Sequence, residues 1–485
     1  MSSDKSNIVN MSRFSSLIKR SGLECKVYQE EGVNWCVDNE KRCKGGFIAD
    51  EMGLGKTIMM IGVMYSNFMR NSLIIVPPIL LEQWYLQIYR LTGHKSLIYH
   101  GKMKKSITVE ELKSAPIVIS TYNGLVPLSK TDISLLHQVA WSRLIFDEAH
   151  HLRNKNTRIY KCARALKSNV RWLVSGTPVQ NNKKDFYALC CMLRLQPNYY
   201  MESSNLRDLA HNYILKRTKK QVGINIASLH TTNEIVVWKS QKEKELSEEI
   251  HSCVSFSRVN AGNRAKSSLV MAFGESGALP LLLRAKQSCV YPKLMMRKLD
   301  ELVEKGQIRD SSLYQEGLSS SSKLDAVVTS IVDRKGNGCG KLVFCHFREE
   351  MDEIAERLQK HNMTVSLLDG RTSGSKRSEI LGNAYDVLIL QIQTGCEGLN
   401  LQENYSDIYF ISPHWNPAVE DQAIARCHRI GQRKEVCVHR FQMESFGVED
   451  NVPTRTIDKY VDDVQEVKRI IASEIIDPFY KSGAK

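Results

Sequence analysis

Residues 46–57 read GFIADEMGLGKT, and this stretch decides the fold of the chain. Its apolar start predicts a short strand, its two glycines a tight loop, and the sequence from Lys56 onwards, KTIMMIGVMYSNF, a helix. This order is typical of a phosphate-binding loop, G-x-x-x-x-G-K-[ST], in a parallel α/β unit. Gly55, Lys56 and Thr57 fit the pattern, whereas Asp50 occupies the position of the first glycine. The stretch is therefore a damaged site, a chance match or a specialised loop.

A second motif, LIFDEAH at 144–150, favours a working nucleotide site. The helix after the loop would offer free N–H groups to phosphate. Lys56 would reach the β- and γ-phosphates, and the Thr57 hydroxyl would bind Mg²⁺. Asp147, at the tip of an apolar strand, can hold the same ion, and Glu148 is placed to activate the attacking water as a general base.

Two series of short apolar runs predict two mostly parallel sheets with helices on both faces. The predicted fold class is therefore α/β, with two sheets in one chain. The first series comprises 72–77, 116–121, 141–148 and 171–176, and the second comprises 341–347, 365–370, 386–391, 407–412 and 436–441.

Four segments are expected along the chain. The first lobe, with a basic helical protrusion, is expected at 1–239, and a helical insertion that ends in a serine-rich linker at 240–320. The second lobe is expected at 321–445, and an amphipathic helix that packs on the core at 446–485. The apolar stripe of that last helix comprises Ile457, Tyr460, Val461, Val464, Val467, Ile470 and Ile471.

Composition narrows the class of protein. The chain has 485 residues, a formal net charge of +14 and a pI near 9.1. Such a charge indicates a polyanionic partner, usually nucleic acid, or a basic surface that keeps the protein soluble. The 13 cysteines include no C-x-x-C pair, so zinc ribbons and RING domains are not expected. Reduced thiols, as in the cytosol or nucleus, are expected instead. The most apolar stretch is too short to span a bilayer, so no membrane partner is expected.

The loop and the DEAH motif together resemble those of the Swi/Snf-related ATPases of helicase superfamily 2. In that family Asp typically replaces the first glycine, so Asp50 resembles a family variant rather than damage. The resemblance implies two RecA-like lobes that bind ATP and Mg²⁺ between them. It also implies nucleotide contacts along the whole loop, from Asp50, Glu51, Met52, Gly53, Leu54, Gly55, Lys56 and Thr57.

The resemblance runs nearly end to end and keeps the order of the family's motifs. Gln29, in YQEEGVNW, matches the residue that recognises adenine. The segments 73–84 and 119–125 resemble those that contact the DNA backbone, and Ser175 and Thr177 belong to a motif that links hydrolysis to movement. Further matches are LKRTKKQV (215–222), SCVYPKL (288–294), SSKLDAV (321–327), LLDGRTSGSKR (367–377), TGCEGLNLQ (394–402) and DQAIARCHRIGQ (421–432).

The residues of the last motif, 421–432, also predict a helix and an arginine face independently of the resemblance. Asn416 is expected to cap a helix that begins at Pro417. Gln422, Arg426 and Arg429 then fall at i, i+4 and i+7, on one helix face. The resemblance implies that the two arginines reach the γ-phosphate, where an arginine finger is worth roughly 10³–10⁵ in rate. The alternative is a solvated arginine face.

Nucleic-acid contacts are expected from backbone amides and hydroxyls near Pro77, Thr121 and Thr394, together with surface lysines and arginines. Contacts to phosphate read no sequence and weaken steeply with salt. The resemblance implies double-stranded DNA as the partner, with nucleosomes or DNA-bound proteins as cargo.

Three functions compete. The favoured one is an ATP-dependent translocase on double-stranded DNA that remodels chromatin or displaces bound proteins. The alternatives are a strand-separating helicase on RNA or DNA, and a DNA or chromatin binder without catalysis. The chain resembles the short stand-alone members, including those of large DNA viruses. A monomer in the nucleus is expected, with a cytoplasmic viral factory or the virion as the alternative location.

Overall fold

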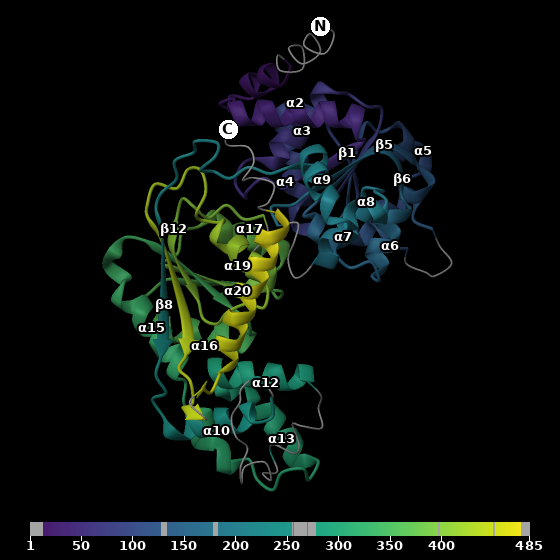
Figure 1. The fold of residues 1–485 in the computed structure, drawn as a ribbon. Helices are drawn as coiled ribbons and strands as arrows, with labels where there is room; N and C mark the ends of the chain where they lie inside the picture. Colours follow the sequence, from purple (N-terminus) through teal and green to yellow (C-terminus); the bar gives the residue numbers. More distant parts are fainter. Residues whose placement is uncertain are drawn as a thin grey trace. The chain divides into compact units, whose positions relative to one another are not determined.

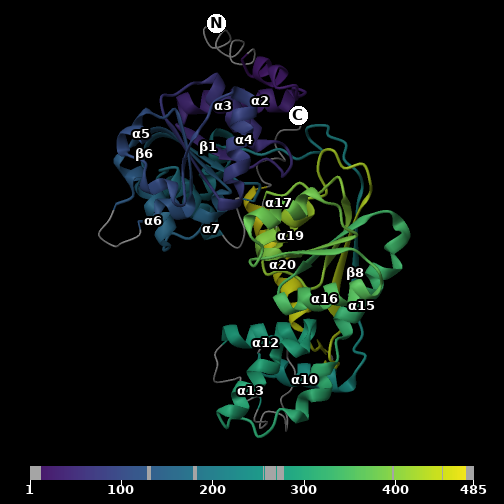
Figure 2. The same cartoon turned by 180° about the vertical axis from the view of Figure 1, so that it is seen from behind.

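The computed structural model divides the chain into two compact units (Figures 1 and 2). The first comprises residues up to Asn225 and those from Lys468, and the second runs from Ile226 to Val467. The structure describes residues 13–127, 133–177, 183–254, 256, 269, 278–395, 398–449 and 452–476. Among these described residues, no helix combines the length and apolar character that crossing a membrane requires.

The first unit contains a seven-stranded parallel sheet with the order β3-β4-β2-β5-β6-β1-β7. The four strands expected beside the loop strand are confirmed, whereas the short β3 and β7 carry too few apolar residues to be recognised. The strands are β1 (Gly45–Ile48), β2 (Ser72–Val76), β3 (Leu97–Tyr99), β4 (Ile117–Thr121), β5 (Ala140–Asp147), β6 (Lys167–Val174) and β7 (Ile214–Leu215).

Both faces of this sheet are buried, which explains the continuous apolar runs. Along β2, Leu73 and Ile75 belong to one hydrophobic cluster and Ile74 and Val76 to another. The helices of the unit are α2 (Val27–Arg42), α3 (Lys56–Ser66), α4 (Leu81–Thr92), α5 (Val109–Ser114), α6 (Arg158–Ala165), α7 (Lys183–Met192), α8 (Pro197–Met201) and α9 (Leu206–Tyr213).

The second unit contains a six-stranded parallel sheet with the order β10-β11-β9-β12-β13-β8. All five expected strands are present, so the predicted α/β class with two parallel sheets is confirmed. They are β9 (Gly340–Cys345), β10 (Val365–Leu368), β11 (Val387–Gln391), β12 (Tyr405–Phe410) and β13 (Val436–Met443). The helices between them are α15 (Ser322–Asp333), α16 (Arg348–Lys360), α17 (Gly374–Gly382), α18 (Ile392–Gly395) and α19 (Pro417–Ile424).

Strand β8 (Leu229–Val236) corrects the expected boundary of the first lobe. It was expected within 1–239, but it pairs in parallel with β13 over its whole length and belongs to the second unit. Most of its side chains are exposed, as an edge strand allows. Its polar sequence LHTTNEIV therefore lacks the apolar run by which the other strands were recognised.

The expected helical insertion is observed as α10 (Gln241–His251), α12 (Ala278–Val290), α13 (Met296–Glu304) and α14 (Gln315–Ser319). The serine-rich stretch 311–323, expected as a linker, has exposed residues such as Leu313 and is buried at its end, where α15 begins. Ser322 is buried, and its backbone N–H donates to the buried Glu243 carboxylate at 3.1 Å. Serine there supplies hydrogen bonds that a buried carboxylate requires.

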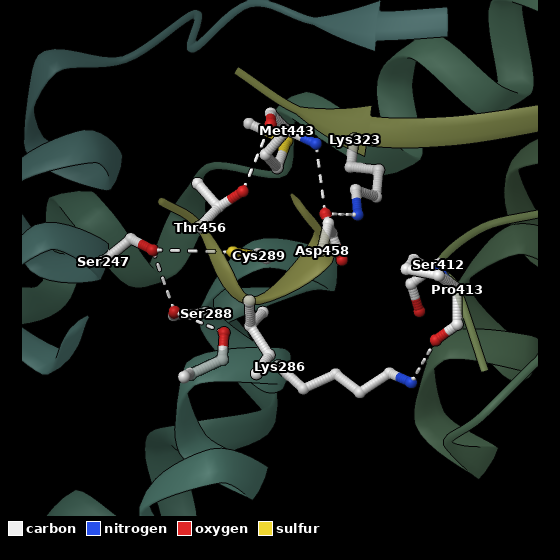
Figure 3. A network of polar contacts seen from close by, with 12 residues as sticks. Ser247, Lys286, Ser288, Cys289, Lys323, Ser412, Pro413, Met443, Thr456 and Asp458 are labelled. Carbon is white, nitrogen blue, oxygen red and sulfur yellow. Dashed lines mark hydrogen bonds and ion pairs between the residues drawn. The ribbon is translucent and has the colours of Figure 1, made fainter. Parts of the chain in front are cut away.

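Buried charges join the insertion to the second sheet (Figure 3). Lys323, on α15, forms an ion pair with Asp458, whose carboxylate also accepts the N–H of Met443 at 3.0 Å. Lys286, on α12, donates to the Pro413 carbonyl at 3.0 Å, and burial lowers the pKa of its ammonium group to about 8. Buried polar groups that bond to one another thus determine how α12 and the start of the last helix pack.

The expected C-terminal helix is α20 (Ile457–Ile476), and it crosses the boundary between the two units. Ile457 and Val461 are buried in the core of the second unit, whereas Ile471 packs against a core cluster of the first. Val467 and Ile470 are half exposed, so the expected continuous apolar stripe is wrong in its middle. The start of α20 is thus buried in the core of the second unit, and Ile471, further along, is partly buried against a cluster of the first.

Candidate nucleotide-binding site

The phosphate loop connects β1 to α3 as the sequence predicts. Gly55 precedes the helix with a φ of +80°, in the left-handed region that favours glycine. A Cβ atom there would lie 2.4 Å from Nε2 of Gln29. The Gln29 amide in turn donates to the Leu54 carbonyl at 3.2 Å. Gln29 therefore supports the loop directly, and its contact with adenine stays a prediction.

Lys56 and Thr57 begin α3, where the free N–H groups of a helix lie. The Lys56 ammonium donates to the Asp50 carbonyl at 2.8 Å, which folds the side chain over the loop. Gly176, after β6, makes room for it, because a Cβ there would lie 3.3 Å from Nζ of Lys56 and 2.9 Å from Cγ of Met52. Sequence reasoning missed Gly176.

Asp50 has a role that the sequence did not reveal. Its carboxylate is fully buried and accepts from Nη2 and Nε of Arg217 at 2.6 and 3.2 Å. Arg217 also donates to the Tyr28 carbonyl, and the N–H of Lys219 donates to Glu51 at 2.8 Å. The side chains of Asp50 and Glu51 thus attach the loop to the basic stretch 215–222, and the Asp50 carboxylate is not free for nucleotide.

Asp147 is the last residue of β5, at the same edge of the sheet as the phosphate loop after β1. The turn after β6 links the two motifs, because Gly176 lies beside Lys56 and the preceding Ser175 lies 3.3 Å from His150 of the DEAH motif. Burial, with the charge of Glu148, raises the pKa of Asp147 to about 7. Oδ2 accepts from Nε1 of Trp84 at 2.7 Å, and the Tyr122 hydroxyl donates to the Asp147 carbonyl at 2.6 Å. Sequence reasoning missed both aromatic partners.

Glu148 is linked to the motif after β6. It has a φ of +47°, which turns the chain sharply after the strand. Its carboxylate lies 3.3 Å from Nδ1 of His150, which lies 3.3 Å from the Ser175 hydroxyl. Thr177 follows, and its N–H donates to that hydroxyl at 3.3 Å. The structure therefore brings the predicted general base and the predicted coupling residues together.

The chemistry of the donor set fits Mg²⁺. The Thr57 hydroxyl and the Asp147 carboxylate are oxygen ligands of the kind that Mg²⁺ binds with phosphate. The indole of Trp84 and the N–H of Glu148 both donate to the Asp147 carboxylate and orient it. No group of three or more His, Cys, Asp or Glu side chains placed to hold a metal occurs in the described ranges.

The arginines of the second unit depart from the predicted geometry. Asn416 caps α19 as expected, by accepting the N–H of Ala418 at 3.1 Å. The helix ends at Ile424, however, so Gln422, Arg426 and Arg429 do not share one helix face, and that prediction is wrong.

The reason is a change in backbone hydrogen bonding. The N–H groups of Arg426 and Cys427 donate to carbonyls three residues earlier, which tightens the helix into turns. Arg426 lies over the chain before β12, where Nη1 donates to the Leu399 carbonyl at 3.4 Å, and Arg429 bonds to Asn400. Burial and the charge of Arg426 lower the pKa of Arg429.

Comparison with known proteins assigns the family. The SNF2-related domain matches residues 28–203, and the helicase conserved C-terminal domain matches residues 322–431. Together they cover more than half of the chain, in the order in which the two units follow each other. The chain belongs to the SNF2-related family. Membership of this family of helicase-like ATPases indicates that it binds and hydrolyses ATP.

The SNF2-related relatives come from viruses, bacteria and plants. The probable global transactivator of Orgyia pseudotsugata multicapsid polyhedrosis virus is 26% identical, over 93% of this chain and 91% of its own. The ATP-dependent helicase MG018 of Mycoplasma genitalium is 27% identical, over 94% of this chain and 43% of its own. CHROMATIN REMODELING 24 of Arabidopsis thaliana is 25% identical, over 89% of this chain and 45% of its own. The chain thus spans less than half the length of MG018 and of CHROMATIN REMODELING 24.

A solved structure is also similar. The Sulfolobus solfataricus SWI2/SNF2 ATPase core in complex with dsDNA is 24% identical, covers 94% of this chain and 93% of that chain, and has a TM-score of 0.40.

Two segments of this chain that are expected to contact nucleic acid, 73–84 and 119–125, contain the carboxyl ends of β2 and β4. Pro77 follows β2 and is buried. Thr121 ends β4, and its fully buried hydroxyl lies 3.2 Å from Nδ1 of His100. The whole residue is buried, so the predicted contact at this segment is left to neighbours such as Asn123, which is exposed. The side chain of Thr394 lies outside the described residues.

Proposed function

We propose that the chain is an ATP-driven motor that moves along double-stranded DNA. One observation carries the proposal. The Gly-Lys-Thr loop, the Asp147–Glu148 pair and Ser175 converge on one edge of the first sheet, at the carboxyl ends of β1, β5 and β6. In an open parallel sheet ligands bind at this edge.

Each residue then has a task in hydrolysis. The N–H groups at the start of α3 and the Lys56 ammonium bind the phosphates. Thr57 and Asp147 would hold Mg²⁺, which neutralises charge on the transferring phosphoryl group. Glu148 takes a proton from the attacking water, and His150 orients Glu148 and connects it to Ser175. Gln29 recognises adenine.

Arg426 and Arg429 are proposed to complete the site from the second unit. An arginine that meets the γ-phosphate stabilises the charge of the transition state. Among their partners are neutral oxygens of the chain before β12, and Nε of Arg426 also donates to the Gln422 carbonyl at 3.0 Å; a phosphate is a stronger acceptor than these groups. Hydrolysis then depends on both units, so a cycle of ATP binding and release alternates two arrangements of the motor.

Double-stranded DNA is proposed as the track. The net charge of +14 supports a polyanionic partner, and relatives named CHROMATIN REMODELING 24 and ATP-dependent DNA helicase DDM1 support DNA and chromatin. Remodelling of nucleosomes or displacement of bound proteins is the proposed work. We place the protein in the nucleus, with a cytoplasmic viral factory or the virion as the alternative.

The test compares ATP turnover of the wild type and Lys56→Ala without nucleic acid, with single strands, with duplex DNA and with nucleosomes. We expect duplex DNA to stimulate the wild type most and Lys56→Ala to bind DNA without turnover. A wild-type rate no higher than that of Lys56→Ala, with DNA present, contradicts the enzyme and favours a DNA or chromatin binder.

Movement needs its own assay. Displacement of a third strand from a triplex reports translocation, and separation of a plain duplex reports unwinding. We expect the first without the second. Efficient strand separation would replace the translocase with a helicase.

A further inference from the structure

We propose that Trp84 and Tyr122 are positioning residues that link nucleic-acid binding to the orientation of Asp147. This inference rests on the proposed function, because it names how the partner regulates the same site. Both residues lie in segments expected to contact the nucleic-acid backbone, 73–84 and 119–125, and both donate a hydrogen bond to Asp147.

Trp84 lies in the first turns of α4, after the turn that follows β2. Its side chain is 1% exposed, and Nε1 donates to Oδ2 of Asp147 at 2.7 Å. The other carboxylate oxygen, Oδ1, accepts the N–H of Glu148 at 3.0 Å. The indole and that N–H together determine the plane of the Asp147 carboxylate. An indole has a single donor, so this bond has a single direction.

Tyr122 begins the turn Tyr122–Leu125 directly after β4. It is 4% exposed, and its hydroxyl donates to the main-chain carbonyl of Asp147 at 2.6 Å. One segment therefore holds the side chain of Asp147 and the other holds its backbone. The two hydrogen bonds are independent, because the donors lie on different segments and the acceptors are different atoms of Asp147.

The order of the sheet makes this arrangement possible. Strands β4, β2 and β5 are neighbours and run parallel, so their carboxyl ends meet at one edge. Tyr122 directly follows β4, Trp84 lies on α4, the helix that follows β2, and Asp147 ends β5. A displacement of either segment by about 1 Å takes its hydrogen bond beyond 3.5 Å, where little of the interaction remains.

The same residues could serve packing alone, and two buried aromatic residues of the same unit test this. Trp141 donates from Nε1 to the Leu136 carbonyl at 2.9 Å, and the Tyr160 hydroxyl donates to the Ala188 carbonyl at 3.0 Å. Both are as buried as the proposed positioning residues, at 1% and 4% exposure. Replacement by Phe keeps a ring and removes one donor in all four cases.

The first readout is nucleotide binding rather than turnover. Fluorescent ADP is titrated with Mg²⁺ at equilibrium, in the absence of DNA. We expect Trp84→Phe to raise the half-saturating Mg²⁺ concentration about 10–100-fold, as loss of a residue that orients a metal ligand does, and to leave nucleotide binding without Mg²⁺ unchanged. Trp141→Phe is expected to match the wild type.

The second readout measures the link to DNA. In the wild type we expect duplex DNA to lower the half-saturating Mg²⁺ concentration, and Mg²⁺ with ADP to tighten DNA binding by the same factor, since such coupling is reciprocal. Tyr122→Phe is expected to reduce that factor towards one while DNA alone still binds. Tyr160→Phe is expected to preserve the factor.

Wild-type Mg²⁺ binding in Trp84→Phe, or an equal shift in Trp141→Phe, overturns the role of Trp84. An unchanged coupling factor in Tyr122→Phe overturns that of Tyr122. If Trp84→Phe does not fold, Trp84→Leu replaces it, because leucine also lacks a donor, with the same Mg²⁺ titration as the criterion. Failure of the proposed function is seen separately, because it removes DNA stimulation from the wild type, whereas the Mg²⁺ titration of Trp84→Phe needs no DNA.

Discussion

Removal of Asp50 should open the phosphate loop, because the residue holds Arg217 from a fully buried position. Removing one partner of a buried ion pair costs about 3–5 kcal/mol, since the other charge is left uncompensated. Arg217 is 15% exposed and can find water, so we expect Asp50→Ala to cost about 3 kcal/mol. Arg217→Met leaves a carboxylate at 0% exposure and should cost about 5 kcal/mol.

The double variant separates the ion pair from ordinary packing. Replacement of both charges by apolar groups removes the uncompensated charge, so Asp50→Ala with Arg217→Met should cost less than Arg217→Met alone. The coupling free energy between the two positions should then exceed about 3 kcal/mol. Two hydrogen bonds to a charged group, each worth about 1.5–3 kcal/mol, are consistent with that value.

Hydrogen exchange followed by mass spectrometry is the suitable assay, because the chain has two units and a single melting temperature would mix them. Opening free energies are compared for peptides that cover 45–66 and 214–224. Asp38→Ala with Lys41→Ala, an exposed pair at 3.7 Å in the same unit, is the matched control and should show a coupling of at most about 0.5 kcal/mol. Additive effects of Asp50 and Arg217, as in the control, would refute the reasoning.

Other parts of the chain offer sharper single tests. Burial raises the pKa of Glu350 to about 7, so the stability contributed by its protonated form is lost as pH rises from about 4.5 through 7. Glu350→Gln should therefore flatten the pH dependence of the opening free energy of α16, read by hydrogen exchange over that range. Glu353→Gln is the control. Burial raises the pKa of Glu353, but hydrogen bonds from Arg357 and Tyr291 lower it overall, so the stability that the Glu353 carboxylate contributes grows as pH rises. Asp458→Ala leaves the buried Lys323 without its partner and should lower the free energy of unfolding by about 3–5 kcal/mol. Hydrogen exchange at the start of α20 measures this loss, and unchanged exchange would exclude a structural role for the ion pair. Gly55→Ala, at a φ of +80°, should weaken nucleotide binding about tenfold at a strain of about 1.4 kcal/mol, whereas Gly93→Ala, at +72° with open space around it, should not.

Contiguous signals in the sequence were sufficient for the main architecture. The strand–loop–helix order of 46–57, the nine apolar runs and the cap at Asn416 were all confirmed, because each depends on neighbours in the chain. Two parallel sheets followed from those runs, since a strand buried on both faces needs apolar residues throughout. The family was recognisable for the same reason, from ordered short motifs.

Positions that depend on a distant partner were not predictable in this way. β8 carries no apolar run, and its place is decided by pairing with β13. The turn at Arg426 was read as helix because periodicity cannot show where i→i−4 hydrogen bonds give way to i→i−3. The burial of Ser322 at the end of the serine-rich stretch is not predictable from the sequence, because its partner, Glu243, lies far away in the chain.

From the sequence alone one can derive which residue types the nucleotide site contains and in what order the strands, loops and helices that carry them follow. Tertiary structure decided what holds them in place. Asp50 meets Arg217 across 167 residues, and Trp84 meets Asp147 across 63. Such contacts exist because a parallel sheet collects the carboxyl ends of strands at one edge, in a spatial order that differs from their order along the chain.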